Sequence, residues 1–313
     1  AMAALIDPAD GADPIGRQFL PDPRELEARP DERADPIGDG AHSPVRGVVH
    51  RYPDRALFAP TLVCPVYCRF CFRREVVGPA ALAALTRAEI EAALGYFRAH
   101  SEIREVILTG GDPLGLTPAR LGALVGALAA IAHVAVIRAH SRVPVATPER
   151  VTDDFVAALA GPIRSHGKTV AVAVHANHPR EFTPAARAAL RRLADAGIML
   201  LSQSVLLAGV NDDADTLAAL MRAFVESGAK PYYLHHPDLA PGTAHFRLPI
   251  ARGLALVRGL RGRISGLAQP TYVLDIPGGH GKVALDGAAA QPVGEGVWEL
   301  ADFRGRAHLY REA

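Results

Sequence analysis

The three cysteines of the chain lie in one short segment, CPVYCRFCFRR (64–74), at the spacing C-x3-C-x2-C. Cys64, Cys68 and Cys71 are too few and too close together for a disulfide framework. Thiolates bind iron–sulfur clusters, and three of them leave one iron of a 4Fe–4S cube without a protein ligand. A structural zinc site would need a fourth ligand, usually from a second cysteine pair. The segment therefore predicts a cluster with one open iron, where a cofactor or substrate can bind.

Lysine is as rare as cysteine, because it occurs only at Lys168, Lys230 and Lys282. Lys282 ends the glycine-rich turn PGGHGK (277–282), which follows a predicted strand. A lysine amine can form a Schiff base with an aldehyde cofactor, and an arginine cannot. A solvated surface lysine is the alternative interpretation. In a chain that uses arginine almost everywhere else, we interpret Lys282 as a candidate for a covalent bond to a cofactor.

Two aspartates accompany this lysine. Asp275 precedes Lys282 by seven residues on the same predicted strand, and Asp238 follows the predicted strand PYYLH (231–235). Single aspartates in loops are most often caps or turn residues. Two that converge beside a Schiff-base lysine would instead suit an ammonium group at the far end of a substrate.

Six apolar runs alternate with helical patterns and must position these residues. Strands are predicted at 56–62, 105–110, 134–140, 169–175, 198–203 and 231–235. Helices are predicted at about 80–100, 117–131, 152–162, 183–196, 213–228 and 249–261, several with N-caps at Thr117, Thr152, Thr183 and Asp212. Six β–α units in series predict an α/β fold, a parallel sheet closed or partly closed into a (β/α)6 TIM-like barrel. The cysteine segment follows the first strand, at the end of the barrel where sites collect.

The two ends of the chain depart from this pattern. Residues 1–50 are rich in Pro, Asp, Gly and Arg and repeat the pentapeptide ADPIG, so we expect an irregular arm packed on the barrel, residues 51–262. The remaining residues, 263–313, are expected to form a small β-rich lobe over the barrel mouth. Its short strands are predicted at 271–276, 283–285, 293–300 and 307–310.

Composition limits the partners and the compartment. The 313 residues are 49% hydrophobic, which excludes a wholly disordered chain. Lysine plus arginine number 34 against 33 acidic residues, so the formal charge of +1 predicts neither a nucleic acid nor an anionic membrane as partner. We expect no membrane span and no signal peptide, and the clustered thiols favour a cytoplasmic location.

The cysteine motif, with the aromatic Tyr67 before its second cysteine, resembles the signature of the radical S-adenosylmethionine (SAM) enzymes. Within that superfamily, residues 50–285 resemble the lysine 2,3-aminomutases, which depend on pyridoxal 5′-phosphate (PLP). The matching elements are HRYPDR (50–55), CPVYCRFCFRR, LTGGDP (108–113), SRVPV (141–145), HANHP (175–179), LSQSVLLAGVND (201–212), PYYLHHPDL (231–239), HFR (245–247), LRGRISG (260–266) and DIPGGHGK (275–282).

The resemblance implies three cofactors, a 4Fe–4S cluster, SAM and PLP, and assigns roles by motif. The cluster ligands would be Cys64, Cys68 and Cys71, and Lys282 would form the internal aldimine with PLP. The side-chain ammonium of lysine would meet Asp238 and Asp275, and its α-carboxylate would meet Arg73. The implied PLP contacts are Arg51, Tyr52 and Arg55. The implied SAM contacts are Gly110, Gly111, Asp112, His175 and Gln203.

The implied activity is the isomerisation of L-lysine to β-lysine. An electron from a donor such as flavodoxin or ferredoxin would cleave SAM at the cluster. The resulting 5′-deoxyadenosyl radical would take a hydrogen atom from C3 of lysine, held as an external aldimine on PLP, and the nitrogen would then migrate. A site with two buried aspartates is expected to disfavour glutamate and apolar amino acids, whose binding leaves the carboxylates unpaired.

Some features depart from the family pattern and leave alternatives open. The chain is short for the family and lacks the extra cysteines with which longer members bind a structural zinc, so we expect a homodimer. His280 interrupts a loop that is often all glycine, and His236 and Pro237 precede Asp238. One alternative is supply of β-lysine for modification of elongation factor P, although that branch typically loses the D-x-P-G-G-x-G-K arrangement. The others are a 2,3-aminomutase of another amino acid such as arginine, and a non-catalytic iron–sulfur module.

Overall fold

The computed structural model describes residues 2–77, 84–285, 287, 290–302 and 304–312. Its main sheet has nine strands that follow one another in chain order. The parallel strands are β2 (Arg55–Thr61), β3 (Glu105–Gly110), β4 (Val136–Ser141), β5 (Thr169–His175), β6 (Met199–Val205), β7 (Lys230–His235) and β8 (Thr271–Ile276). The antiparallel edges are β1 (Val48–Tyr52) and β9 (Gly281–Ala284).

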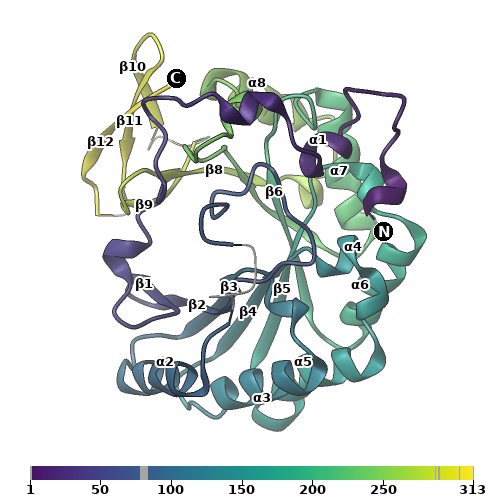
Figure 1. Cartoon of the computed structure of the whole chain (residues 1–313), viewed down its shortest axis with the longest axis vertical. Helices are drawn as coiled ribbons and strands as arrows, with labels where there is room; N and C mark the ends of the chain where they lie inside the picture. Colours follow the sequence, from purple (N-terminus) through teal and green to yellow (C-terminus); the bar gives the residue numbers. More distant parts are fainter. Residues whose placement is uncertain (1, 78–83, 286, 288–289, 303, 313) are drawn as a thin grey trace.

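The sheet curves into a nearly closed barrel with helices on its outside (Figure 1). These helices are α2 (Arg87–Ala99), α3 (Pro118–Ala129), α5 (Asp153–His166), α6 (Pro184–Asp195), α7 (Ala214–Glu226) and α8 (Ile250–Leu260). Among the described residues, no strand pairing joins β1 to β9. Instead, the Tyr52 hydroxyl on β1 accepts a hydrogen bond of 2.6 Å from the Lys282 N–H on β9. The predicted TIM-like α/β barrel is confirmed.

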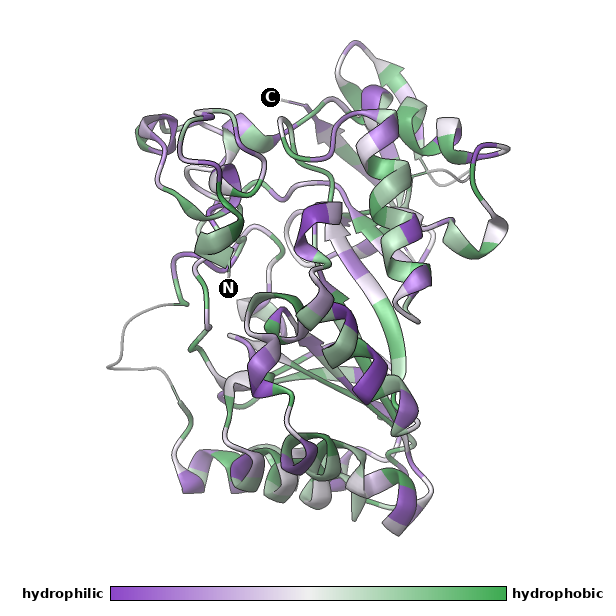
Figure 2. Ribbon diagram, turned by 90° about the vertical axis from the view of Figure 1, so that its right-hand side faces the viewer, coloured by the Kyte–Doolittle hydropathy of each residue, from purple (hydrophilic) through white to green (hydrophobic). Residues whose placement is uncertain are grey.

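The core lies between the strands and the outer helices. Phe58 on β2 and Phe97 on α2 are fully buried, with ring centroids 5.5 Å apart. β3 and β5 are buried along most of their length, as parallel strands covered on both faces should be. Figure 2 shows hydrophobic and hydrophilic residues alternating along the helices, which present one face to the sheet. No helix in the described part of the chain is both long and apolar enough to span a membrane.

Local capping chemistry explains where the helices begin. Thr117, Thr152 and Thr183 each accept a hydrogen bond from a backbone N–H in the first turn of α3, α5 and α6, as predicted. The prediction for α7 is wrong by one residue. Asp213 is its N-cap, whereas Asp212 accepts the N–H of Gly209 in the preceding turn.

The C-terminal strands belong to two sheets, whereas the prediction placed them together in one lobe. β8 lies parallel to β7 in the main sheet instead of lying with the strands over the barrel mouth, and β9 returns beside it. The predicted strand at 293–300 is a hairpin, because Gly296 at positive φ turns the chain in its middle. A separate three-stranded sheet contains β10 (Ala290–Gly294), β11 (Val297–Ala301) and β12 (Ala307–Arg311).

The N-terminal segment lies across the opening of the barrel, where it is drawn in purple in Figure 1. Ion pairs attach it to the body, since Glu25 pairs with Arg69 and Arg74 of the cysteine segment and Glu32 pairs with Arg247. Its short helices are η1 (Met2–Leu5), α1 (Gly16–Phe19), η2 (Pro23–Leu26) and η3 (Gly40–His42). Short helical turns in the barrel loops are η4 (Pro113–Gly115), α4 (Val143–Ala146), η5 (Pro148–Arg150), η6 (Pro179–Glu181), η7 (Ala244–Phe246) and η8 (Gly266–Ala268).

Candidate active site

Cys64, Cys68 and Cys71 are free thiols in the loop that follows β2. Desolvation raises the pKa of Cys64 to about 12 and that of Cys71 to about 11, although Cys64 is the most exposed of the three residues. Charge on the Cys68 thiolate raises both values further, so the thiol groups lie close enough to repel one another when ionised. A cationic iron–sulfur core would relieve this repulsion. The donor set therefore fits the predicted cluster.

A buried arginine orders this loop, and sequence reasoning did not single it out. Arg142, just before α4, donates a hydrogen bond of 3.3 Å to Cys68 Sγ. Its other terminal nitrogen donates to Glu181 and to Gln18, each at 2.6 Å. The side chains of Arg142 and Glu181 are 5% and 0% exposed. Arg142 lies in the SRVPV motif, which was the signal available, but its partners come from segments distant in sequence.

The two glycines of LTGGDP allow a close approach of backbones. A Cβ at Gly110, where φ is +98°, would lie 2.6 Å from the Ala59 Cβ, and one at Gly111 would lie 2.5 Å from the Val63 oxygen. The end of β3 thus packs directly against the chain that leads to Cys64. This contact explains both glycines within the fold, and their contact with SAM stays a prediction.

Both carboxylate oxygens of Asp112 accept hydrogen bonds from backbone N–H groups. Its Oδ1 accepts the Leu114 N–H at 3.0 Å, and its Oδ2 accepts the N–H groups of Arg142 and Val143 at 2.8 and 3.2 Å. The residue therefore fixes the start of α4, including the arginine that donates to Cys68. Its contact with SAM stays a prediction.

His175 and Gln203 are neighbours on adjacent strands, in register at the ends of β5 and β6. The His175 ring lies 5.6 Å from the ring of Phe70, which is in the cysteine segment. Burial lowers the pKa of His175 well below its usual value, so the imidazole is neutral. His175 therefore lies beside the cysteine loop, with Gln203 as its cross-strand neighbour, as a SAM site at the cluster would require.

Lys282 and Asp275 are cross-strand partners on β9 and β8. The lysine Nζ lies 2.8 Å from Oδ1 and 2.8 Å from Oδ2 of the aspartate. The Lys282 side chain is 31% exposed and that of Asp275 is 4% exposed. Burial alone would raise the pKa of Asp275, but the charge of Lys282 and a contact with His235 hold it well below its usual range. The pair is therefore ionised.

Asp238 shares this site, and its charge state is different. Burial raises its pKa to about 8, and the charge on Asp275 adds to the shift. The cations Lys282 and Arg73 oppose the shift without cancelling it. Asp238 is therefore mostly protonated at neutral pH. The structure brings together the predicted lysine, both predicted carboxylates and the predicted arginine.

An aspartate of the N-terminal segment bridges two of the predicted arginines. The Asp39 Oδ1 accepts from Arg51 Nη2 at 2.9 Å, and its Oδ2 accepts from Arg73 Nη2 at 2.8 Å. Asp39 follows the second ADPIG repeat, where the Asp35 carboxylate accepts the N–H groups of Asp39 and Gly40. Sequence reasoning noted the repeat but did not name Asp39.

Tyr52 and Arg55 differ in their relation to Lys282. The Tyr52 hydroxyl accepts the Lys282 N–H, so this residue is part of the site. The Arg55 guanidinium lies 3.9 Å over the Tyr52 ring and also pairs with the exposed Asp54 at 2.7 Å. Arg55 therefore reaches the site through Tyr52, and its predicted contact with PLP is untested.

Several buried nitrogens near Lys282 have no hydrogen-bond partner among the described residues: Arg51 Nε, His140 Nε2 and His235 Nε2. Burial and the charges of Arg138 and Lys282 lower the pKa of His140, which also places it near the lysine. Buried polar atoms are rarely left unsatisfied in proteins. The barrel interior therefore offers donors and acceptors for a polar ligand, which fits a phosphorylated aldehyde cofactor bound beside Lys282.

Comparison with known proteins gives concordant matches. Residues 58–221 match the model of the Radical SAM superfamily. The chain is 42% identical over 282 residues to an L-lysine 2,3-aminomutase of Acetoanaerobium sticklandii, which covers 90% of this chain and 67% of the relative. It is 37% identical over 282 residues to a glutamate 2,3-aminomutase of Clostridioides difficile, which covers 90% of this chain and 65% of the relative.

Among solved structures, a radical SAM methyltransferase from Sphaerobacter thermophilus matches with a TM-score of 0.49 and 20% identity, over 72% of this chain and 68% of that one. The lengths of the curated relatives also differ from that of this chain. It spans 67% and 66% of two L-lysine 2,3-aminomutases, and between 59% and 81% of the other relatives named as aminomutases.

Proposed function

The chain belongs to the lysine 2,3-aminomutase family of radical SAM enzymes, and from this premise we propose that it isomerises L-lysine to β-lysine. The observation that carries the proposal is the ionised Lys282–Asp275 pair in one buried site with Asp238 and Arg73. The amine can bond an aldehyde cofactor, the carboxylates suit a substrate ammonium, and the guanidinium suits an α-carboxylate.

The family implies a 4Fe–4S cluster, SAM and PLP as cofactors. When bound, these groups supply hydrogen-atom abstraction and an electron sink for the migrating nitrogen. We assign the cluster to Cys64, Cys68 and Cys71, because they are free thiols of one loop whose thiolates would repel one another without a cationic partner. PLP is assigned to Lys282, with Arg51, Tyr52 and Arg55 around it. SAM is assigned to the ends of β3, β5 and β6, at Gly110, Gly111, Asp112, His175 and Gln203.

The protein side chains would exchange partners as ligands bind. Lys282 is the cation beside Asp275 at present. While the Lys282 amine is engaged with the cofactor, the Asp275 carboxylate would be available to the side-chain ammonium of the substrate. Asp238 would release its proton as that second cation arrives, because a nearby positive charge favours the carboxylate form. Arg73, which Asp39 holds in place, would meet the α-carboxylate.

The pair of carboxylates favours lysine over glutamate. A charge-assisted hydrogen bond contributes about 1.5–3 kcal/mol, so loss of even one such contact weakens binding by roughly one to two orders of magnitude. A glutamate side chain would in addition bring a like charge toward Asp275, whose carboxylate is ionised and buried. One of the relatives is a glutamate 2,3-aminomutase, so this preference needs a direct comparison. Arginine, with its cationic side chain, is the second candidate substrate.

We also propose the assembly and the setting in which the enzyme works. Cys64 is exposed, which supports reduction of the cluster by an external one-electron carrier such as flavodoxin or ferredoxin. Three free cysteines suit a reducing compartment, which supports the cytoplasm. The proposed assembly is a homodimer of chains, each with an arm (1–50) on a radical SAM barrel whose sheet includes β8 and β9.

One reconstitution experiment tests the proposed reaction. The protein is loaded anaerobically with iron, sulfide, PLP, SAM and a reductant, and is then offered lysine, arginine, glutamate or alanine separately. We expect β-lysine from lysine and little product from the others, with Lys282→Arg as the inactive control. A product from arginine or glutamate alone would contradict the substrate assignment. An intact cluster with no product from any amino acid would favour a non-catalytic iron–sulfur protein.

A further inference from the structure

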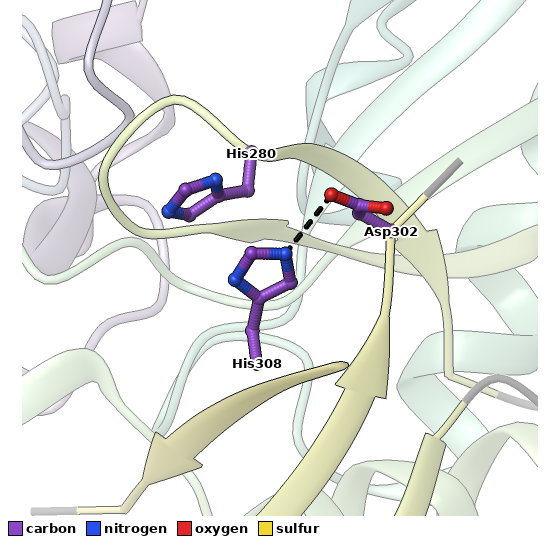
Figure 3. Close-up of side chains that lie close together, drawn as sticks. All are labelled: His280, Asp302 and His308. Atoms are coloured by element: carbon purple, nitrogen blue, oxygen red, sulfur yellow. Dashed lines mark hydrogen bonds and ion pairs between the residues drawn. The ribbon is translucent and has the colours of Figure 1, made fainter. Parts of the chain in front are cut away.

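A second group of metal-ligating side chains lies outside the site described above. His280 is in the turn between β8 and β9, Asp302 directly follows β11, and His308 is on β12. Their ligand atoms all lie within 4.8 Å of one another. Figure 3 shows the two imidazole rings side by side and the carboxylate next to the His308 ring. The turn that leads into β9, the strand of Lys282, thus meets the separate C-terminal sheet at three groups that commonly bind metals.

The Asp302 carboxylate is oriented by the backbone. Its Oδ1 accepts the N–H groups of Arg304 and Arg306 at 2.8 and 2.9 Å. Its Oδ2 lies 2.9 Å from His308 Nε2. The contact with His308 and the two backbone donors lower the pKa of Asp302 to about 2, so the carboxylate is ionised at neutral pH. In known metal sites, hydrogen bonds from surrounding groups orient the ligating side chains in this way.

The two imidazoles complete the group. The ring centroids of His280 and His308 are 4.0 Å apart, with 30° between the ring planes. Two imidazoles and one carboxylate form a donor set that suits a divalent cation.

We propose that His280, Asp302 and His308 bind a zinc ion, with water as the fourth ligand. Zinc sites with three protein ligands and one water are tetrahedral, with bonds of about 2.0–2.2 Å to nitrogen and oxygen. The ion binds between His308 Nε2 and Asp302 Oδ2, with the His308 ring proton on Nδ1, and draws His280 in by a rotation of its exposed ring. The site contains no thiol, which distinguishes it from the cysteine cluster.

The zinc ion would hold the turn before Lys282 on the side that faces the C-terminal sheet. His280 is the only residue of the turn GGHG (278–281) that carries a side chain. On the other side the turn is already packed against β1, since a Cβ at Gly281 would lie 2.7 Å from the Tyr52 hydroxyl. A zinc ion at His280 joins this turn to the C-terminal sheet and so limits the movement of Lys282.

The test uses the full chain with the cluster cysteines replaced, Cys64→Ser, Cys68→Ser and Cys71→Ser, so that thiolates cannot bind the added metal. The protein is equilibrated with zinc, freed of excess metal and analysed for its elements, and we expect about one zinc ion per chain. In the same background, His280→Ala, Asp302→Asn and His308→Ala should each bind zinc at least about tenfold more weakly. His166→Ala, which removes an exposed histidine of α5, is the matched control and should bind zinc normally.

Further measurements make each outcome decisive. Cobalt(II) in place of zinc should give visible bands of a tetrahedral site without thiolate charge transfer, and these bands should disappear in His280→Ala. Circular dichroism checks that each variant folds, and His280 is exposed, so its loss should not unfold the chain. The proposal would be overturned if the cysteine-free chain held no zinc after removal of the excess metal. It would also be overturned if the His280→Ala and His166→Ala variants held the same amount of zinc per chain. Iron(II) bound more tightly than zinc at the same three residues would overturn the choice of metal.

Discussion

Lys282 Nζ lies 2.8 Å from both carboxylate oxygens of Asp275, its cross-strand partner in the last two strands of the barrel sheet. The antiparallel turn from β8 to β9 brings them together although seven residues separate them in the chain. The aspartate is almost fully buried, so the lysine is the counter-ion that keeps it charged. The proposed cofactor lysine is thus also a structural cation, and its two roles can be separated by mutation.

Lys282→Arg and Lys282→Ala are both expected to abolish the Schiff base with PLP, because neither side chain has a primary amine. They should differ in stability. Arginine keeps a cation beside Asp275, whereas alanine leaves this buried carboxylate with only the more distant Arg51 and His235, at 3.9 and 3.7 Å, at a cost of about 2–3 kcal/mol. Borohydride reduction followed by mass spectrometry measures the adduct, and thermal or denaturant unfolding measures the stability. An adduct retained in Lys282→Ala, at Lys168 or Lys230, would contradict the assignment.

The affinity for lysine is expected to rise with pH up to about 8, the value to which burial and Asp275 raise the pKa of Asp238. Below this pH the Asp238 carboxyl is neutral in the free enzyme, and binding of a substrate ammonium must displace its proton. Affinity should therefore increase by up to about tenfold per pH unit below 8 and level off above it.

Titration calorimetry in buffers of different ionisation enthalpy should detect the proton released on lysine binding. Asp238→Asn should remove both the proton release and the slope with pH. Norleucine, which lacks the side-chain ammonium, is the matched ligand control. An equal slope for norleucine and lysine would show that another group titrates.

Arg142 is expected to set the reduction potential of the cluster, since it donates to Cys68 Sγ from a buried position. Hydrogen bonds and positive charge near cluster sulfurs raise the potential. Arg142→Met should therefore lower the potential by some tens of millivolts in an EPR-monitored redox titration. Because this change also removes the ion-pair partner of the buried Glu181, the double variant Arg142→Met/Glu181→Gln is the proper comparison. A potential unchanged in both variants would exclude this role.

Glu25 is expected to anchor the N-terminal arm to the cysteine segment. Burial opposes its ionisation, but hydrogen bonds from Arg69 and Arg74 lower its pKa to about 2. A depressed pKa stabilises the folded state above the unfolded value of about 4.3, and that stabilisation is lost as the pH falls toward 2. Glu25→Gln should therefore cost about 2–3 kcal/mol at pH 7, with a smaller difference from the wild type near pH 3.

The matched control for this prediction is Glu27→Gln. Glu27 forms an ion pair with Arg29, and both side chains are more than half exposed, at 57% and 51%. Exposed pairs contribute about 0–1 kcal/mol, so this variant should unfold almost like the wild type at every pH. If both variants lose the same stability, the Glu25 contacts do not hold the arm.

Much of this protein follows from patterns that are local in the sequence. The C-x3-C-x2-C spacing, the scarce lysine on a glycine turn and the six β–α repeats predicted the ligands, the candidate Schiff-base lysine and the barrel. Helix starts at Thr117, Thr152 and Thr183 were also predicted, because a cap depends only on its own first turn. Resemblance by motif supplied the predicted roles of the remaining site residues, which stay predictions, and the comparisons confirm the family.

The rest depended on tertiary structure, because it arises from contacts between segments far apart in the chain. No local pattern places Asp39 between Arg51 and Arg73, or Arg142 beside Cys68. The same holds for β8, which completes the barrel sheet because its pairing with β7 is non-local. Charge states also belong to the folded molecule. Asp238 and Asp275 are the same amino acid in sequence and both are desolvated, and only the direct contacts of Asp275 with Lys282 and His235 keep it ionised while Asp238 is protonated.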